Sequence, residues 1–232
     1  MFSKDFIKDF DILTNEISKE PFAFVRYADG EHAVLERQPI QGHDWHMSPE
    51  YKIASEDINE SLNYRHNRYF YGVSCYCCDP PKAEYFKNKL VDCWERVTYS
   101  NLFANANYIK TLEWLGKIDK PICVLGNLNM VSKKLPFKGS SVFYPSNIVQ
   151  LYNSGYKEDI IAASITGTKI KDNVVLVALG PLSEILIHKM WLENPSNYYI
   201  DIGSVIDPFI HGLTRDYHRK DSPFSKKVCN NL

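Results

Sequence analysis

The first strand-like segment of the chain reads Phe22-Ala23-Phe24-Val25-Arg26-Tyr27-Ala28-Asp29-Gly30-Glu31-His32. β-Branched and aromatic residues dominate its first half, which follows a proline and runs into an Asp-Gly pair, a pattern typical of a buried strand ending in a tight turn. Ligands of open α/β sheets bind beyond the carboxyl ends of the strands. We therefore expect Arg26, Asp29 and Glu31 at a binding site. In an alternative interpretation, Asp29 only caps a helix over residues 30–37.

Strand-like and helix-like segments alternate along the rest of the chain. The sequence predicts strands at 69–74, 102–105, 121–126, 141–145, 173–181 and 198–203. It predicts helices at 4–19, 50–65, 80–99, 106–115, 147–163 and 181–191, and a loop at 39–49. The segment 173–181 is almost entirely apolar, which suits a central parallel strand covered on both faces. This alternation predicts an α/β fold with a parallel sheet built from right-handed βαβ units.

Length and composition favour one domain without a general affinity for nucleic acid. The chain has 232 residues, 44% of them apolar, and is expected to form a single domain over 1–232 with a loosely structured tail over 215–232. Twenty-seven basic and 28 acidic residues give a net charge of −1, so an anion must be recognised locally. Charges near the N-terminus and the lack of a long apolar window predict a cytoplasmic protein without an integral membrane segment.

The six cysteines lack the spacing of a small disulfide framework, and we expect them to be reduced. The run Cys75-Tyr76-Cys77-Cys78 could supply thiolates to a metal. Zinc-binding pairs, however, usually sit two to four residues apart with a second pair downstream, and free cysteine is commonly buried. We therefore interpret this run as the buried end of a strand.

Asp29 and Glu31 are the candidate metal ligands. They are one residue apart at a turn into a helix, so both carboxylates can approach one cation. Carboxylate oxygens suit Mg²⁺ or Mn²⁺, which keep several waters and bridge to phosphates. Arg26 adds a planar fork that can pair with a phosphate or hold a carboxylate in place.

Further candidates follow the later strands. Gly180 and Pro181 open a helix whose N–H groups and dipole favour a phosphate, unless they form a plain strand-to-helix turn. Asp201 and Asp207 lie in one apolar loop and could bind a sugar hydroxyl or take a proton, or serve only the turn. Asn127, followed by Asn129, offers an amide or simple turn chemistry.

Two groups of basic or imidazole side chains have open interpretations. His43, Asp44 and His46 are candidate bases or metal neighbours, or ordinary surface residues. A cluster near the C-terminus could meet a pyrophosphate if the tail folds back, or could be solvated; it comprises Arg215, His218, Arg219 and Lys220. The absence of Gly-x-Gly-x-x-Gly, Walker and Gly-x-Ser-x-Gly motifs speaks against dinucleotide oxidoreductases, P-loop proteins and serine hydrolases.

Two stretches together resemble the bacterial GT-D glycosyltransferases, a group defined by a formerly uncharacterised domain. Residues 26–31, Arg-Tyr-Ala-Asp-Gly-Glu, are similar to that family's Arg-aromatic-Gly-Asp-Gly-Glu segment with its Asp-x-Glu metal motif, although Ala28 replaces a glycine. Residues 178–181 followed by 200–203, Ile-Asp-Ile-Gly, are similar to its closing unit, in the same order and at a similar separation.

The resemblance implies a Rossmann-like, mostly parallel sheet flanked by helices, and sugar transfer from a nucleotide diphosphate donor, with a UDP-sugar expected, to a saccharide acceptor. Asp29 and Glu31 would take the metal role, Arg26 would support them, and Gly180 and Asp201 would line the donor pocket. His43 joins Asp29, Glu31 and Asp201 as a catalytic candidate; Pro181, Asn127 and Asp207 are further binding candidates. The acceptor would be a saccharide, either free or linked to lipid or protein. The protein itself would be cytoplasmic, with a peripheral place at the inner membrane face as the alternative. The competing hypotheses are a metal-dependent nucleotide or phosphoester hydrolase and a non-catalytic nucleotide- or glycan-binding module.

Overall fold

A computed structural model describes residues 1–41, 46–47, 52–127, 135–210 and 212–232. Its centre is a seven-stranded sheet in which every neighbouring pair is parallel, with the order β5-β4-β1-β9-β8-β6-β7. The strands are β1 (Ala23–Tyr27), β4 (Tyr69–Val73), β5 (Val97–Tyr99), β6 (Ile122–Asn127), β7 (Ser140–Tyr144), β8 (Val174–Val177) and β9 (Tyr198–Asp201). The predicted α/β fold with a parallel sheet is confirmed.

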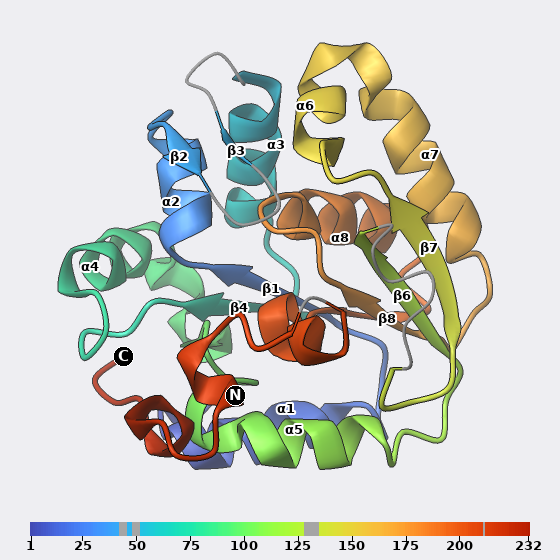
Figure 1. The fold of residues 1–232 in the computed structure, drawn as a ribbon. Coiled ribbons are helices and arrows are strands. Elements are labelled where there is room, and N and C mark those ends of the chain that lie inside the picture. Colours follow the sequence, from blue (N-terminus) through green and yellow to red (C-terminus); the bar gives the residue numbers. More distant parts are fainter. Residues whose placement is uncertain (42–45, 48–51, 128–134, 211) are drawn as a thin grey trace.

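Helices cover both faces of this sheet (Figure 1). On one face lie α1 (Phe6–Glu16) and α5 (Tyr108–Leu115). On the other lie α2 (Asp29–Leu35), α3 (Lys52–Asn63), α4 (Pro80–Lys89), α6 (Ile148–Leu151), α7 (Lys157–Gly167) and α8 (Leu182–Glu193). None of the helices in the described ranges is long and apolar enough to cross a membrane.

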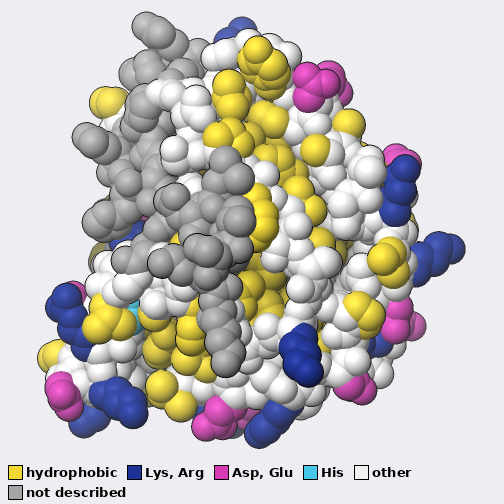
Figure 2. Space-filling model, turned by 45° about the vertical axis from the view of Figure 1, so that its right-hand side comes forward, with side chains coloured by type: hydrophobic (Ala, Val, Ile, Leu, Met, Phe, Trp, Pro, Cys, Tyr) yellow, Lys and Arg dark blue, Asp and Glu magenta, His cyan; other side chains and the backbone are white. Residues whose placement is uncertain are grey.

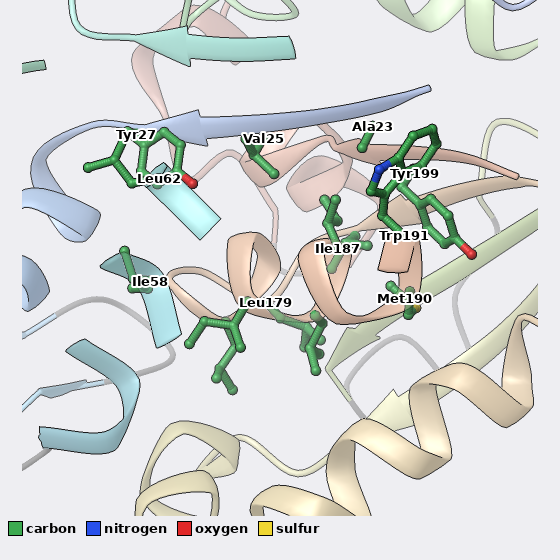
Figure 3. Packing of buried hydrophobic residues seen from close by; sticks show 14 of the residues in the cluster. Ala23, Val25, Tyr27, Ile58, Leu62, Leu179, Ile187, Met190, Trp191 and Tyr199 are labelled. Carbon is green, nitrogen blue, oxygen red and sulfur yellow. The ribbon is translucent and has the colours of Figure 1, made fainter. Parts of the chain in front are cut away.

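Each central strand contributes side chains to two hydrophobic cores, because successive side chains of a strand point to opposite faces. In β1, Ala23, Val25 and Tyr27 belong to the core beneath α3 and α8, whereas Phe24 belongs to the core beneath α1 and α5. Figure 3 shows this β1 face together with side chains of α3, α8 and β9. Burial on both faces explains why β1, β8 and β9 are almost wholly apolar until their carboxyl ends.

Helix starts follow the sequence signals in two clear cases. The Asp5 carboxylate accepts hydrogen bonds from the N–H groups of Ile7 and Lys8, which caps α1. Asp79 accepts from the Lys82 N–H at 3.3 Å and precedes Pro80, so its predicted capping role is confirmed.

The predicted helix over 80–99 is wrong beyond Lys89. The chain continues through the 3₁₀ segment η1 (Val91–Arg96) into β5, which pairs with β4 at the edge of the sheet. The sequence Val97-Thr98-Tyr99 has high strand propensity, and pairing with a neighbouring strand outweighs the helical pattern before it.

Two further predicted elements differ from the structure. Residues 102–105 form a turn leading into η2 (Asn105–Asn107) instead of a strand, and Asn105 adopts a left-handed φ of 53°. The predicted helix over 147–163 is divided into α6 and α7 by the segment η4 (Tyr152–Tyr156), in which Gly155 has a φ of 101°. Such a φ strongly favours glycine and cannot continue a right-handed helix.

The segments at 39–49 and 215–232 contain more structure than loops. In the first, β2 (Ile40–Gln41) pairs antiparallel with β3 (His46–Met47), while 42–45 and 48–49 lie outside the described residues. The tail, expected to be loosely structured, contains η6 (Asp216–His218) and η7 (Pro223–Lys226). It also buries the side chains of His218 and Cys229.

Candidate functional site

An ion pair between Arg26 and Asp201 joins the carboxyl ends of the neighbouring strands β1 and β9. Arg26 Nε donates to Asp201 Oδ2 at 2.7 Å and Nη2 donates to Oδ1 at 3.1 Å, while Nη1 donates to the Ser100 carbonyl oxygen at 3.1 Å. Burial opposes the charge on Arg26, but the Asp201 carboxylate outweighs this effect and raises the pKa of the guanidinium. The guanidinium is therefore fixed in position and charged.

Gly203 makes room for this guanidinium. It follows β9 with a φ of 52°, and a Cβ atom there would lie 1.9 Å from Arg26 Nη2. Its N–H donates to Asp201 Oδ1 at 2.9 Å, which adds a third hydrogen bond to those that the carboxylate accepts from Arg26. The predicted strand over 198–203 thus ends at Asp201, because the following turn must leave space for Arg26.

Two glutamates complete the charged cluster. Glu31, half-buried on α2, accepts a hydrogen bond from the Ala28 N–H at 2.8 Å. Burial raises its pKa to about 7; Asp201 adds to this effect and Arg26 partly opposes it. Glu184, in the first turn of α8, is fully buried. Burial raises the pKa of Glu184 well above its usual range, and the nearby Glu31 and Asp201 carboxylates raise it further.

The cluster holds one cation and three carboxyl groups. Among the described residues, neither carboxyl oxygen of Glu184 has a hydrogen-bond donor. An unpaired buried carboxylate is costly, so the cluster favours either a proton or an added cation on its acids. The carboxylates of the half-buried Glu31 and of the exposed Asp29 on the same helix are oxygen ligands of the kind that suits a divalent cation such as Mg²⁺ or Mn²⁺.

The structure brings three of the predicted residues together: Arg26, Glu31 and Asp201. Asp29 is exposed and is the first residue of α2, whose N-cap is Ala28, so the interpretation of Asp29 as the N-cap is wrong. His43, Asp44 and Asn129 lie outside the described residues, and of His46 only the backbone strand is described.

Other predicted residues line the same edge of the sheet without joining the ion pair. Gly180, with a φ of 58°, and the buried Pro181 lead from β8 into α8, so they lie one turn before Glu184. Asn127 is the last residue of β6. Asp207, in η5 (Gly203–Phe209), accepts a hydrogen bond from the Thr214 hydroxyl at 2.6 Å.

The basic cluster of the tail contains one buried and three exposed side chains. His218 is buried; its Nε2 lies 3.0 Å from the Ser204 carbonyl oxygen, and burial lowers its pKa. Arg215, Arg219 and Lys220 are exposed. A hollow of about 730 Å³ at this place is lined by Leu213, Asp216 and residues 218–224, and none of the four residues of the charged cluster lines it.

Glu184 is a member of the charged cluster that the sequence did not predict. The sequence shows Glu184 only as a single acid near the largely apolar start of α8. Glutamate is rarely fully buried unless other charged or polar groups lie beside it. Asp201 and Glu184 are 17 residues apart in the chain, and they come together because α8 packs beside β9. The sequence alone does not reveal this contact.

Comparisons with known proteins agree with this arrangement at the level of the fold. No family model and no curated protein matches the sequence. Among solved structures, the conserved domain of unknown function 1792, described as having a distinct glycosyltransferase fold, superposes with a TM-score of 0.55 at 11% identity over 85% of this chain and 83% of that one. The chain has a glycosyltransferase fold.

A second solved structure supports the same assignment. It is a new glycosyltransferase of the same domain group from Streptococcus sanguinis, with a TM-score of 0.57 and 15% identity over 87% of this chain and 81% of that one. The fold that the resemblance of residues 26–31 and 178–203 implied is therefore confirmed.

Figure 2 shows a band of hydrophobic side chains on the face that turns forward from the right side of Figure 1. Lysine, arginine and acidic side chains lie mainly around the periphery of this view. The net charge of the chain is only −1, so the charged cluster gains its character from local burial rather than from an overall field.

Proposed function

We propose that this protein transfers a sugar from a nucleotide-diphosphate sugar to a saccharide hydroxyl, in the assembly of surface polysaccharides or glycoconjugates. The observation that carries the proposal is the cluster of Arg26, Asp201, Glu31 and Glu184 at the carboxyl edge of a parallel sheet with a glycosyltransferase fold. Ligands of such sheets bind at this edge. A UDP-sugar is the donor we expect.

Asp29 and Glu31 are the residues that we propose to hold Mn²⁺ or Mg²⁺, because both are carboxylates in the first turn of α2, which follows the strand that carries Arg26. When bound, the ion would stabilise the negative charge that develops on the departing nucleoside diphosphate. Exposure of Asp29 leaves its carboxylate open to an ion that also meets a substrate phosphate.

Arg26 supplies a fixed positive charge at the same place. Its fork is already occupied by Asp201 and the Ser100 carbonyl, so its orientation costs little further entropy when an anionic donor binds. Asp201 acts mainly on Arg26 in this proposal and is a positioning residue. The α8 N-terminus, entered through Gly180 and Pro181, offers N–H groups to a phosphate.

A base must also take the proton of the acceptor hydroxyl. Glu31 has a pKa of about 7, which suits proton transfer near neutral pH, although a metal ligand cannot serve as the base at the same time. Asp207 and His43 remain proposals for this role. Glu184 is too deeply buried to meet an acceptor, and we assign it to holding a proton beside Asp201 and Glu31.

The decisive experiment compares turnover of a UDP-sugar with and without an oligosaccharide acceptor. Glycosyl transfer predicts UDP release that depends strongly on the acceptor and on added Mn²⁺. Release of phosphate or UDP at the same rate without acceptor would favour the hydrolase, and binding without turnover would favour the binding module. Glu31→Gln should abolish acceptor-dependent release, whereas Glu36→Gln, at the exposed end of the same helix, should leave it unchanged.

A further inference from the structure

Four cysteines from two distant parts of the chain meet at one place. Cys75, Cys77 and Cys78 follow β4, and Cys229 comes from the C-terminal tail. Their sulfur atoms all lie within 4.8 Å of one another, and none forms a disulfide. The interpretation of 75–78 as a buried strand end is wrong, because β4 ends at Val73 and, of these three cysteines, only Cys75 is buried.

We propose that these four cysteines bind a structural zinc ion that fastens the C-terminal tail to the segment after β4. Structural zinc sites are tetrahedral with Zn–S bonds of about 2.3 Å, which places neighbouring sulfurs roughly 3.8 Å apart. The Cys77 and Cys78 sulfurs are 3.8 Å apart, and those of Cys78 and Cys229 are 3.9 Å apart. The Cys75 and Cys77 sulfurs are 3.0 Å apart, so they would have to move slightly away from each other to reach the same spacing.

Backbone turns bring the three neighbouring cysteines onto one side. The N–H groups of Cys78 and Asp79 both donate to the Cys75 carbonyl oxygen, each at 3.0 Å, so the chain folds back after Cys75. The tail is aligned by a hydrogen bond of 2.9 Å from the Tyr76 N–H to the Asn231 carbonyl oxygen. Another, of 3.1 Å, joins the Ala106 N–H to the Lys227 carbonyl oxygen. The ligands are thus held by backbone contacts on both sides.

Hydrogen-bond donors surround the sulfurs in the way expected of bound thiolates. The Asn230 N–H points at Cys77 Sγ at 3.4 Å, and the Asn105 side-chain amide points at Cys229 Sγ at 3.5 Å. The Asn101 amide lies 3.9 Å from Cys78 Sγ. Four thiolates and Zn²⁺ carry a net charge of −2, and such donors around a metal site stabilise this charge.

Burial also suits a structural ion. Cys75 and Cys229 are almost fully buried, whereas Cys77 and Cys78 face solvent and leave a path for entry. On binding, four S–H bonds lose their protons to solvent and four Zn–S bonds form, with no change of oxidation state. The sequence alone concealed this site because Cys229 follows Cys78 by 151 residues, so no second pair is visible near the first group.

The test uses the full-length chain, purified under reducing conditions without added metal. Elemental analysis should find about one zinc per chain, and native mass spectrometry should show the matching increase in mass. Replacement of zinc by Co²⁺ should produce the absorption of a tetrahedral cobalt thiolate. Cys78→Ser and Cys229→Ser should lose the metal and this absorption.

The matched control is Cys123→Ser, a buried cysteine in β6 whose sulfur lies 3.8 Å from the Gly167 carbonyl oxygen, which a serine hydroxyl can also contact. It should keep the zinc. Exposed Cys77→Ser separates loss of metal from loss of folding, since it alters no buried side chain. Four freely reactive thiols in metal-free protein, disulfides among the four cysteines, or iron in place of zinc would each overturn the assignment.

Discussion

At the scale of single residues, the site depends on the planar fork of Arg26. Three acceptors fix it: both Asp201 oxygens and the Ser100 carbonyl. Lysine would keep the charge but cannot meet these acceptors with the same geometry. We therefore expect Arg26→Lys to lower kcat/KM for the sugar donor by about tenfold to a hundredfold, as the loss of one or two charged hydrogen bonds would.

The control for this prediction is Arg65→Lys. Arg65 also forms a forked ion pair, with Asp92 at 2.8 and 3.0 Å, but lies on the segment after α3. Its replacement should leave kcat/KM unchanged. If wild-type and Arg26→Lys protein have the same kcat/KM, Arg26 does not take part in donor binding as we propose.

Glu184 gives a prediction on pH and stability. Its folded pKa is raised above the ordinary value of 4.5 by burial, so the folded chain holds this proton while the unfolded chain loses it as pH rises. The free energy of unfolding therefore decreases as pH rises above about 4.5. Glu184→Gln removes this dependence, so its melting temperature should exceed that of the wild type by more at pH 8 than at pH 5.

Thermal unfolding in buffer without added divalent ions measures this difference. Glu193→Gln, an exposed acid at the end of the same helix, is the control and should show no such dependence. If Glu184→Gln and wild-type protein melt with the same pH profile, Glu184 does not carry the proton that we assign to it.

At the scale of elements, α8 is the central helix of its face and is buried almost all round. Leu186 is fully buried, whereas Leu192, on the last turn of the same helix, is 50% exposed. Leu186→Ala should lower the free energy of unfolding by about 2–5 kcal/mol, because it leaves a cavity in the core. Leu192→Ala should change it by less than about 0.5 kcal/mol.

Chemical denaturation followed by circular dichroism measures both changes. The two variants remove the same atoms, so their difference isolates burial from helix propensity. Similar losses in both would contradict the packing of α8 against β1 and β9.

The predictability of each element follows from where its determinants lie. β1, β8 and β9 are apolar and covered on both faces, so their own residues identify them. β5 gains its strand structure from pairing with β4, a contact that its own sequence does not reveal. The interruption at Gly155 likewise depends on a positive φ that the surrounding helical pattern conceals.

At the scale of the whole molecule, some residues of the two clusters can be predicted from their own segment, and others only from contacts between distant segments. Arg26 and Glu31 belong to one segment, and Asp201 ends a recognisable strand, so the sequence could predict all three. Glu184 and the four-cysteine cluster depend on contacts between segments far apart in the chain. Their local sequence carries no periodicity or motif for such contacts, and only the folded topology brings them together.

Binding of the proposed ligands should stabilise the entire fold. A ligand that binds only the folded chain raises the free energy of unfolding by about 2.7 kcal/mol at a hundredfold excess over its dissociation constant. UDP and Mn²⁺ should together raise the melting temperature more than the sum of their separate effects. The reason is that the acids of the cluster repel a diphosphate until a cation lies between them.

A thermal-shift panel of nucleoside diphosphates, with and without Mn²⁺, measures this coupling and also ranks the bases. Asp29→Asn and Glu31→Gln should each lose the part of the rise in melting temperature that depends on Mn²⁺, while Glu36→Gln should keep it. The Cys229→Ser variant should keep it as well if its fold survives, because the cysteine cluster is separate from the residues that contact the diphosphate in this proposal. If UDP raises the melting temperature of the wild type equally with and without Mn²⁺, the proposed ion bridge between the acids and the diphosphate is contradicted. Arg26 and the α8 N-terminus would then suffice to hold the diphosphate.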